Sequence, residues 1–176
     1  DESASTVYVS DPELRLDVGA IAKGWATQRV AEKASEGMLF SIGGNVCSTG
    51  PKTESGTPWV IGVRNPVGSA DDYLHTLNVS GGSYVTSGDY QRFFTVDGVM
   101  YHHIIDPETL MPADYWSSVT VICDDSGLAD ALSTALFLVS REEGQILLDG
   151  CGAAAMWVDG EGNCDYSPGF EEIIRT

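Results

Sequence analysis

Segments with the pattern of β-strands outnumber helical segments in this chain, and the two kinds do not alternate regularly. Runs of β-branched, aromatic or alternating apolar residues predict strands at 38–42, 59–64, 73–79, 93–105, 117–123, 153–163 and 170–175. Helical periodicity is found over 19–37, 126–140 and 141–150. This order of elements predicts an α+β fold with a mostly antiparallel sheet and helices packed against it.

Local signals set the expected ends of these elements. Gly37 is the expected C-cap of the first helix, because glycine readily adopts the conformation that ends a helix. Ser126 is the expected N-cap of the second helix. The pair Asp97-Gly98 predicts a tight hairpin turn. The glycine-rich segment 43–50 is interpreted as a turn after a short strand.

The charge balance restricts the classes of ligand. With 26 acidic and 9 basic residues the net charge is -17, which excludes a nucleic-acid-binding protein, since phosphate backbones require clustered Lys and Arg. An anionic substrate would need a divalent cation or backbone amides to offset this field. The length fits one domain over 1–176. Apolar runs such as 135–139 are far shorter than the ~20 residues of a membrane span.

The four cysteines do not form a recognisable metal or redox motif. They stand at Cys47, Cys123, Cys151 and Cys164, and no CxxC pair occurs. A zinc site or a thioredoxin-type motif is therefore not expected. Their spacing is that of scattered small hydrophobic residues, or of at most one disulfide.

An acid and a hydroxyl share one face of the second predicted helix. Asp130 and Thr134 are four residues apart in "ADALSTALF", so their side chains stack on a helix. Two hard oxygen ligands of this kind suit Mg²⁺, which usually takes one or two protein oxygens and completes its shell with phosphate and water. Alternatively, Asp130 helps to start the helix and Thr134 hydrogen-bonds to its own helix carbonyl.

Two glycine-containing segments could bring backbone close to an anion. In "DVGAIAKG", free amides at the helix start and Lys23 one turn later could bind phosphate, or Lys23 could simply be solvated. In "SIGGNV", Gly43 and Gly44 allow a close approach, and Asn45 offers a donor and an acceptor. Neither segment has the spacing of a Rossmann or P-loop motif. The segment 86–92, "TSGDYQR", is interpreted as a similar turn.

Two of the three histidines are adjacent, in "HHIIDPETLMP". On a strand, His102 and His103 would point to opposite faces, so that one can face a cleft. Asp106-Pro107 is expected to end the strand, because proline cannot donate to the ladder. A histidine in a strand can be structural, or it can take a proton from a hydroxyl, since its usual pKa is near 6.5.

Taken together, the motifs resemble those of the ApbE family, the FAD:protein FMN transferases. The resemblance rests on "DVGAIAKGWA", "SIGGNV", "WVIGVRNP", "VTSGDYQRFF", "HHIIDPETLMP", "SVTV" and "ADALSTALF", which occur in the family's order over nearly the whole chain. Each stretch is weak by itself, whereas the ordered set is specific. The resemblance implies an ApbE-like, T-fold-related α+β architecture.

The resemblance also implies a reaction and roles for individual residues. An enzyme of this family cleaves the diphosphate of FAD, transfers FMN to a Thr or Ser hydroxyl of an acceptor redox protein, and releases AMP. Mg²⁺ would be bound by the side chains of Asp130 and Thr134 and by a backbone carbonyl near Ala20. His103, as the base, and Asp130 would be the catalytic residues. The residues expected to line or support the flavin-nucleotide site are Lys23, Gly43, Gly44, Asn45, Ser87, Gly88 and Asp106.

Two departures from the family's pattern qualify these expectations. The family has Gly in the turn after "HIIDP", where this chain has Leu110, so a reshaped acceptor side is expected. The family also has an N-terminal portion that supplies part of the flavin and adenine pocket, whereas only 1–16 precede "DVGAIAKG" here. The chain is therefore expected to be the C-terminal half to two-thirds of such an enzyme.

Two other functions are compatible with the same residues. Water could replace the protein hydroxyl, which would make the chain an FAD pyrophosphatase giving FMN and AMP. The chain could also be a non-catalytic FAD-binding module, although the retained His103, Asp130 and Thr134 argue against this. By resemblance, the expected location is extracytoplasmic, in a membrane-anchored lipoprotein.

Overall fold

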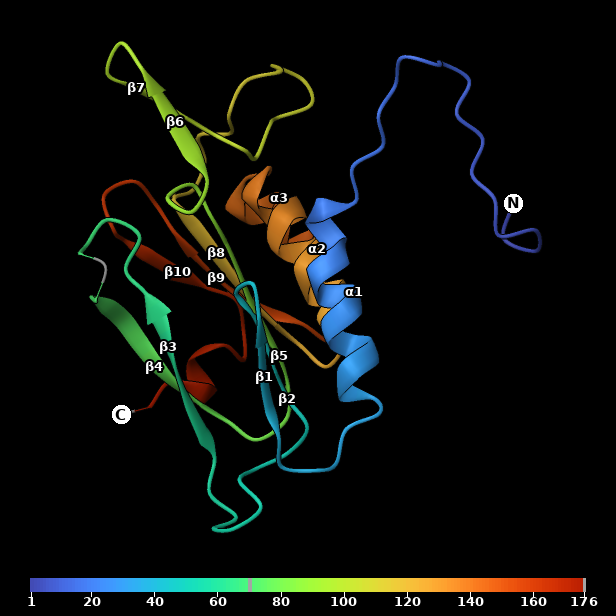
Figure 1. Ribbon diagram of the computed structural model, residues 1–176. Helices are drawn as coiled ribbons and strands as arrows, with labels where there is room; N and C mark the ends of the chain where they lie inside the picture. Colours follow the sequence, from blue (N-terminus) through green and yellow to red (C-terminus); the bar gives the residue numbers. More distant parts are fainter. Residues whose placement is uncertain (70, 176) are drawn as a thin grey trace.

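The computed structural model describes residues 1–69 and 71–175 and contains one large antiparallel sheet (Figure 1). Its strand order is β1-β2-β5-β8-β9-β10, and each neighbouring pair is antiparallel. The six strands are β1 (Leu39–Ile42), β2 (Asn45–Ser48), β5 (Gly82–Gly88), β8 (Ser118–Cys123), β9 (Ala154–Val158) and β10 (Cys164–Tyr166). This arrangement confirms the α+β class and the mostly antiparallel sheet.

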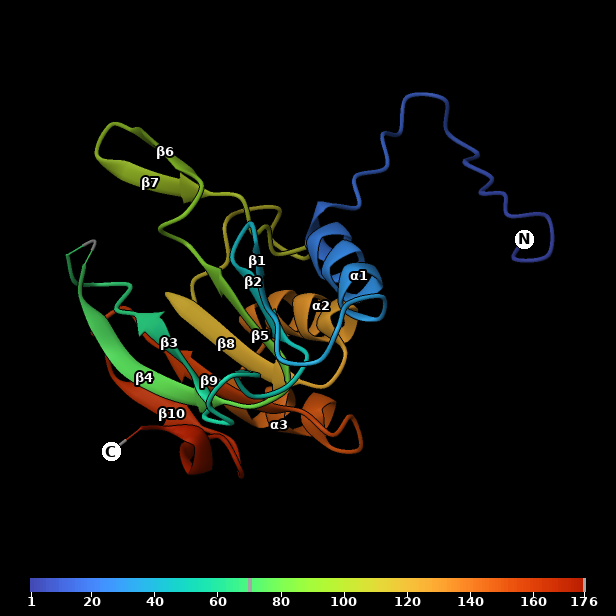
Figure 2. The same cartoon turned by 60° about the horizontal axis from the view of Figure 1, so that its bottom comes forward.

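Helices cover one face of the sheet, and a separate ribbon covers part of the other face (Figures 1 and 2). The helices are α1 (Gly19–Ala31), α2 (Ser126–Phe137) and α3 (Arg141–Leu148), with α2 packed on β5 and β8. The two-stranded ribbon consists of β3 (Trp59–Arg64) and β4 (Tyr73–Val79).

The core is divided by the sheet into two clusters. On the helical side, Leu136 and Phe137 of α2 are fully buried against Val119 and Val121 of β8. On the ribbon side the cluster comprises Val63, Leu77, Val79, Tyr84, Met156, Val158 and Phe170. The central strands are therefore buried on both faces, which makes them a rigid support for groups at their ends.

The helices α1 and α2 approach each other closely at Gly24. A Cβ atom at this position would clash with the Ser126 carbonyl and with the Asp130 Cβ. Glycine therefore permits the close crossing. The crossing sets the start of α1 beside the middle of α2.

Several element boundaries differ from the sequence-based expectations. The helix α1 ends at Ala31 instead of Gly37, which has a φ of +77° in the turn before β1. The N-cap of α2 is Asp125, whose carboxylate accepts a hydrogen bond from the Leu128 N–H, so the assignment to Ser126 was wrong.

Three short segments were also assigned wrongly. In 43–50, only Gly43-Gly44 form a turn, and the residues after them form β2. Thr86–Gly88, interpreted as a turn, form the end of β5. The predicted strand 170–175 contains a 3₁₀ turn at Glu171–Ile173, with one isolated bridge from Ile174 to Leu77.

The hairpin of β6 (Phe93–Val96) and β7 (Val99–His102) was predicted correctly, including its turn at Asp97-Gly98. It projects from the body in both views (Figures 1 and 2). Phe94 stacks on Tyr101 across the hairpin, yet Phe93, Phe94, Val96, Val99 and Met100 are all exposed. Among the described helices, none has the length and hydropathy of a membrane span. All four cysteines are free thiols.

Candidate active site

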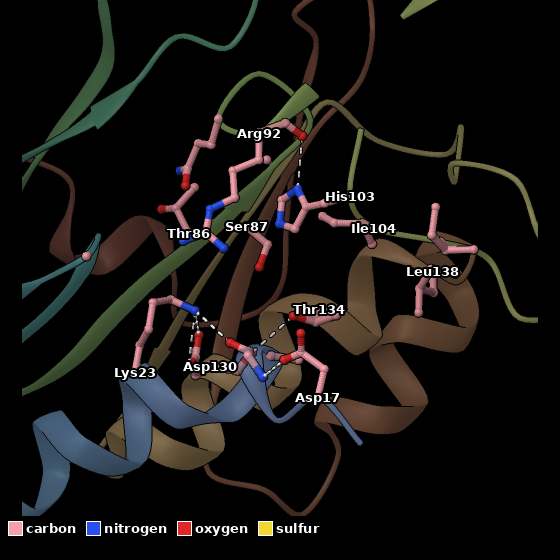
Figure 3. Close-up of a pocket in the computed structure, with 16 residues that line it drawn as sticks. Asp17, Lys23, Thr86, Ser87, Arg92, His103, Ile104, Asp130, Thr134 and Leu138 are labelled. Atoms are coloured by element: carbon pink, nitrogen blue, oxygen red, sulfur yellow. Dashed lines mark hydrogen bonds and ion pairs between the residues drawn. The ribbon is translucent and has the colours of Figure 1, made fainter. Parts of the chain in front are cut away.

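A cavity of about 440 Å³ lies where α1, the β1–β2 turn, the end of β5 and the segment after β7 converge on α2 (Figure 3). Elements distant in sequence thus contribute to one site. It is lined by Asp17, Gly19, Ala20, Lys23, Gly43, Thr86, Ser87, Gly88, Gln91, Arg92, His103, Ile104, Ile105, Asp130, Thr134 and Leu138.

Most of the residues singled out from the sequence lie in this cavity. They are Ala20, Lys23, Gly43, Ser87, Gly88, His103, Asp130 and Thr134. Gly44, Asn45 and Asp106 are outside its lining. Asn45 is 1% exposed on β2, where its amide has no hydrogen-bond partner among the described residues. Asp106 supports the following turn, because its carboxylate accepts from the Glu108 N–H and the Thr109 hydroxyl.

Asp130 is the buried acid of the site, with a side chain that is only 3% exposed. One oxygen, Oδ2, accepts a hydrogen bond of 2.8 Å from the Gly24 N–H of α1. The other oxygen, Oδ1, lies 3.3 Å from the Lys23 ammonium. A buried carboxylate needs such partners, since an uncompensated buried charge is strongly destabilising. The crossing of α1 and α2 therefore fixes the orientation of this acid.

Lys23 and Thr134 flank the Asp130 carboxylate (Figure 3). Besides its ion pair, the Lys23 Nζ donates to the Gly19 carbonyl over 3.2 Å. Among the described residues, the hydroxyl of Thr134, one turn after Asp130, has only the Asp130 carbonyl as a hydrogen-bond partner, over a long 3.5 Å. The predicted stacking on one helix face is confirmed. The weak back-bond leaves the Thr134 oxygen available to another partner.

His103 faces the cavity from the segment after β7 (Figure 3). Its Nδ1 lies 3.3 Å from the Arg92 carbonyl oxygen, which can only accept, so Nδ1 carries the proton. The neutral ring therefore has an unprotonated Nε2. Partial burial lowers the pKa of His103 below its usual value, and the positive charge of Arg92 acts in the same direction.

His102 has the opposite tautomer and a different role. It is 7% exposed, and its Nε2 donates to the Ala113 carbonyl over 2.8 Å. Its Nδ1 accepts from the Ile104 N–H. Both ring nitrogens are thus engaged in joining the two ends of the loop that follows His103. Of the two histidines, only His103 has a ring nitrogen available in the cavity.

Two hydroxyl-bearing residues at the end of β5 complete one wall. Ser87 shares a hydrogen bond of 2.8 Å with Ser133 of α2, and Thr86 shares one of the same length with Thr120 of β8. Strand β5 is buried between β2 and β8, so these groups are held rigidly. Rigid donors at a strand end suit the recognition of a polar ligand.

Asp17, Gln91 and Arg92 line the cavity although none was predicted as a site residue. Asp17 accepts a hydrogen bond from the Gly19 N–H at the start of α1, over 2.6 Å. Its place directly before the helix was a usable signal. Arg92 and Gln91 reach the cavity only because the β6–β7 hairpin starts there, which no local pattern indicates.

The oxygen atoms that line the cavity could coordinate a metal ion. Among the described residues, no group of three His, Cys, Asp or Glu side chains could hold a metal. The cavity instead offers one buried carboxylate, the Thr134 hydroxyl and backbone carbonyls of the first turn of α1. All are hard oxygen donors, and an ammonium group already lies against two of them. The site therefore fits a Mg²⁺ ion that shares its coordination with substrate phosphate.

Comparisons with known proteins identify relatives. The model of the ApbE family matches residues 1–157. The FAD:protein FMN transferase of Treponema pallidum is 34% identical, with 97% of this chain and 51% of that protein covered. The FAD:protein FMN transferase of Klebsiella pneumoniae is 39% identical, and the match covers 82% of this chain and 45% of that protein. The chain therefore spans about half the length of these curated relatives.

Solved structures show the same fold. The ApbE protein of Thermotoga maritima has a TM-score of 0.84 at 39% identity, covering 92% of this chain and 54% of that one. The flavin transferase ApbE of Vibrio cholerae has a TM-score of 0.77 at 30% identity, and the match covers 92% of this chain and 53% of that one. At these identities the likeness extends beyond general architecture to the family.

Proposed function

The chain belongs to the ApbE family, and from this we propose that it forms the metal- and diphosphate-binding part of an FAD:protein FMN transferase. The observation that carries the proposal is one cavity containing the buried Asp130 carboxylate, Lys23 and a histidine with a free ring nitrogen. The comparisons support the reaction, because several relatives bear the name of this activity.

The proposed reaction balances with the groups present. The oxygen of a Thr or Ser hydroxyl on the acceptor bonds to the FMN phosphorus, while the diphosphate bond breaks. AMP leaves with the bridging oxygen. The hydroxyl proton passes to Nε2 of His103, which is neutral near pH 7 because its pKa lies below the usual value.

The other cavity residues would bind and orient the phosphates. Lys23 carries a positive charge within the cavity, where it can reach a phosphate oxygen. The hydroxyl of Ser87 and the backbone at Gly43 and Gly88 line the same space. Asp130, Thr134 and a backbone carbonyl at Ala20 would hold Mg²⁺. When bound, this ion would offset the negative charge that develops on the phosphates.

The acceptor and the location are part of the proposal. We propose a redox protein that presents Thr or Ser as the acceptor. The family resemblance also predicts a location outside the cytoplasm, with attachment to a membrane through a lipid anchor. It further predicts that a part of the flavin pocket is supplied by residues other than those of this chain.

The test is AMP release from FAD, measured by chromatography with Mg²⁺ and with EDTA. Asp130→Asn keeps an acceptor for the Gly24 N–H but removes the charge, so Mg²⁺-dependent release should fall at least about 100-fold. Asp165→Asn, at an exposed acid on β10, is the control for the lost charge and should release AMP as the parent does. An unimpaired Asp130→Asn variant would refute the assignment.

The products separate the three functions. AMP together with free FMN would identify a pyrophosphatase. AMP together with a fluorescent, flavin-labelled acceptor band would identify the transferase. Tight FAD binding without AMP release under Mg²⁺ would identify a binding module.

A further inference from the structure

The Lys23 ammonium lies against the carboxylate that a divalent cation would use. Its Nζ is 3.3 Å from Asp130 Oδ1, 3.5 Å from Asp130 Oδ2 and 3.2 Å from the Gly19 carbonyl oxygen. These atoms are the hard oxygens that the metal would use or lie beside. A single small cation thus already lies among them, and it belongs to the protein itself.

The Asp130 carboxylate does not need Lys23 to keep its orientation. Oδ2 is held at 2.8 Å by the Gly24 N–H, which belongs to the backbone of α1 and cannot move independently. Oδ1, in contrast, has the ammonium as its close cationic partner. A metal ion could therefore replace the ammonium at Oδ1 without any rotation of the carboxylate.

The Asp130 carboxylate does need a positive charge of some kind. Its side chain is 3% exposed, and a carboxylate at such a position is unfavourable when left unpaired. A cation must therefore be present before as well as after metal binding. Lys23 supplies that charge when the metal is absent.

Lys23 is free to move away. Its side chain is 35% exposed, and within residues 1–69 and 71–175 its one hydrogen bond apart from those to Asp130 is to the Gly19 carbonyl. Its stem passes Gly43 in the β1–β2 turn, where a Cβ would lie 3.2 Å from the Lys23 Cδ. Lysine is a flexible four-carbon chain with a compact charge, so it can exchange one oxygen partner for another at small cost.

We propose that Lys23 is an exchangeable internal cation. It occupies the metal position of the apo protein and is displaced when a divalent cation binds, after which its ammonium turns to the substrate phosphate. That this phosphate belongs to FAD rests on the proposed function. The competition between the ammonium and the metal ion does not depend on it. Lys23 thereby couples metal binding to phosphate binding, because an ammonium that has turned to the phosphate has left Asp130 Oδ1 open to the metal.

The proposal predicts that a substitution in the site increases the affinity for the metal ion. Removal of a residue from the phosphate site should strengthen metal binding, because the competing cation is lost. For Lys23→Met, the dissociation constant of Mn²⁺ without FAD should fall roughly ten-fold, the order expected for loss of one partly exposed competing charge. Phosphate binding should weaken in the same variant.

The experiment is a calorimetric titration of the whole chain with Mn²⁺ in the absence of FAD. Lys33→Met is the matched control, since it removes an equally positive but exposed side chain just beyond α1. Lys23→Gln is a second variant that keeps a donor for the Gly19 carbonyl without the charge, and it serves if Lys23→Met does not fold. Thermal unfolding establishes that each variant is folded.

Tighter Mn²⁺ binding by the Lys23 variants than by Lys33→Met would support the exchange. Equal affinity, or weaker binding by the Lys23 variants, would overturn it, because Lys23 would then be a bystander or a support of the site. The absence of Mn²⁺ binding in every variant would also overturn it. Failure of the transferase proposal would appear separately, as tight metal binding without AMP release from FAD.

Discussion

The two adjacent histidines show how single atoms assign roles at this site. His102 and His103 follow one another, yet their rings have opposite tautomers, because one Nδ1 meets the Ile104 N–H and the other meets the Arg92 carbonyl. His102 is thereby committed to the loop. His103 keeps Nε2 available as a base.

This assignment predicts a pH dependence. Partial burial lowers the pKa of His103, so the folded state prefers the neutral ring. The contribution to stability is present above the unfolded pKa of about 6.5 and is lost as the pH falls through the lower folded value. The rate of AMP release should fall through that same folded pKa, and His103→Asn should reduce it by about 10²–10⁴-fold.

A proton NMR titration of His103, assigned by comparison with His103→Asn, measures this pKa directly. The chain unfolded in urea gives the reference. A folded pKa at or above the unfolded one would contradict the argument, since burial could then not be the dominant influence.

At the residue scale, the sequence predicted which side chains lie together where their spacing within one helix determines it. Asp130 and Thr134 are related by one helical turn, so their pairing needs no knowledge of the tertiary fold. Asn45 lies outside the cavity lining and is buried on β2, which its position in the sequence does not indicate. Arg92 was missed, because its place depends on the β6–β7 hairpin.

The element scale centres on the crossing of α1 and α2. Gly24→Ala should improve the helix propensity of α1 by about 1 kcal/mol. The added methyl group, however, would clash with the Ser126 carbonyl. Forcing the helices apart should cost more than the propensity gains, with a net loss of about 1–3 kcal/mol in the free energy of unfolding. The Gly24 N–H should also move from the Asp130 carboxylate.

Urea unfolding monitored by circular dichroism checks this prediction. Gly160→Ala is the control, because a Cβ there meets no atom within 4 Å and the backbone has no left-handed φ. If Gly24→Ala proved as stable as the control, the close crossing would not depend on glycine.

The three helices and most strands were predicted, whereas β2, β5 and β10 were not. The periodicity of α2 and α3 persists over several turns, and the β6–β7 hairpin has an explicit turn signal. The strands β2 and β10 have only four and three residues, and their neighbours alone define them. Leu110, noted as a departure from the family's glycine, adopts a φ of +58°, the conformation that glycine favours.

At the scale of the whole molecule, two surfaces remain apolar and exposed. They are the projecting β6–β7 hairpin and the part of α1 with Ile21 and Trp25, which are one helical turn apart. Both lie next to elements that line the cavity. The chain spans about half the length of the curated relatives it matches.

The net charge of -17 gives the last prediction its physical basis. Like-charge repulsion destabilises the compact state, so any salt should raise the melting temperature by screening. A specific Mg²⁺ site adds to this effect. At ten times its dissociation constant, the ion stabilises the folded chain by about 1.4 kcal/mol, or roughly 3–6 °C in melting temperature.

Thermal unfolding in MgCl₂ and in NaCl of equal ionic strength separates screening from binding. The excess stabilisation by MgCl₂ should disappear in Asp130→Asn, which keeps the hydrogen bond to Gly24 but loses the charged ligand. Asp165→Asn, with the same change in net charge at an exposed position, should retain it. If both salts raised the melting temperature equally in the parent chain, the cation would act on the acidic surface as a whole, and the Asp130 site would have no part in it.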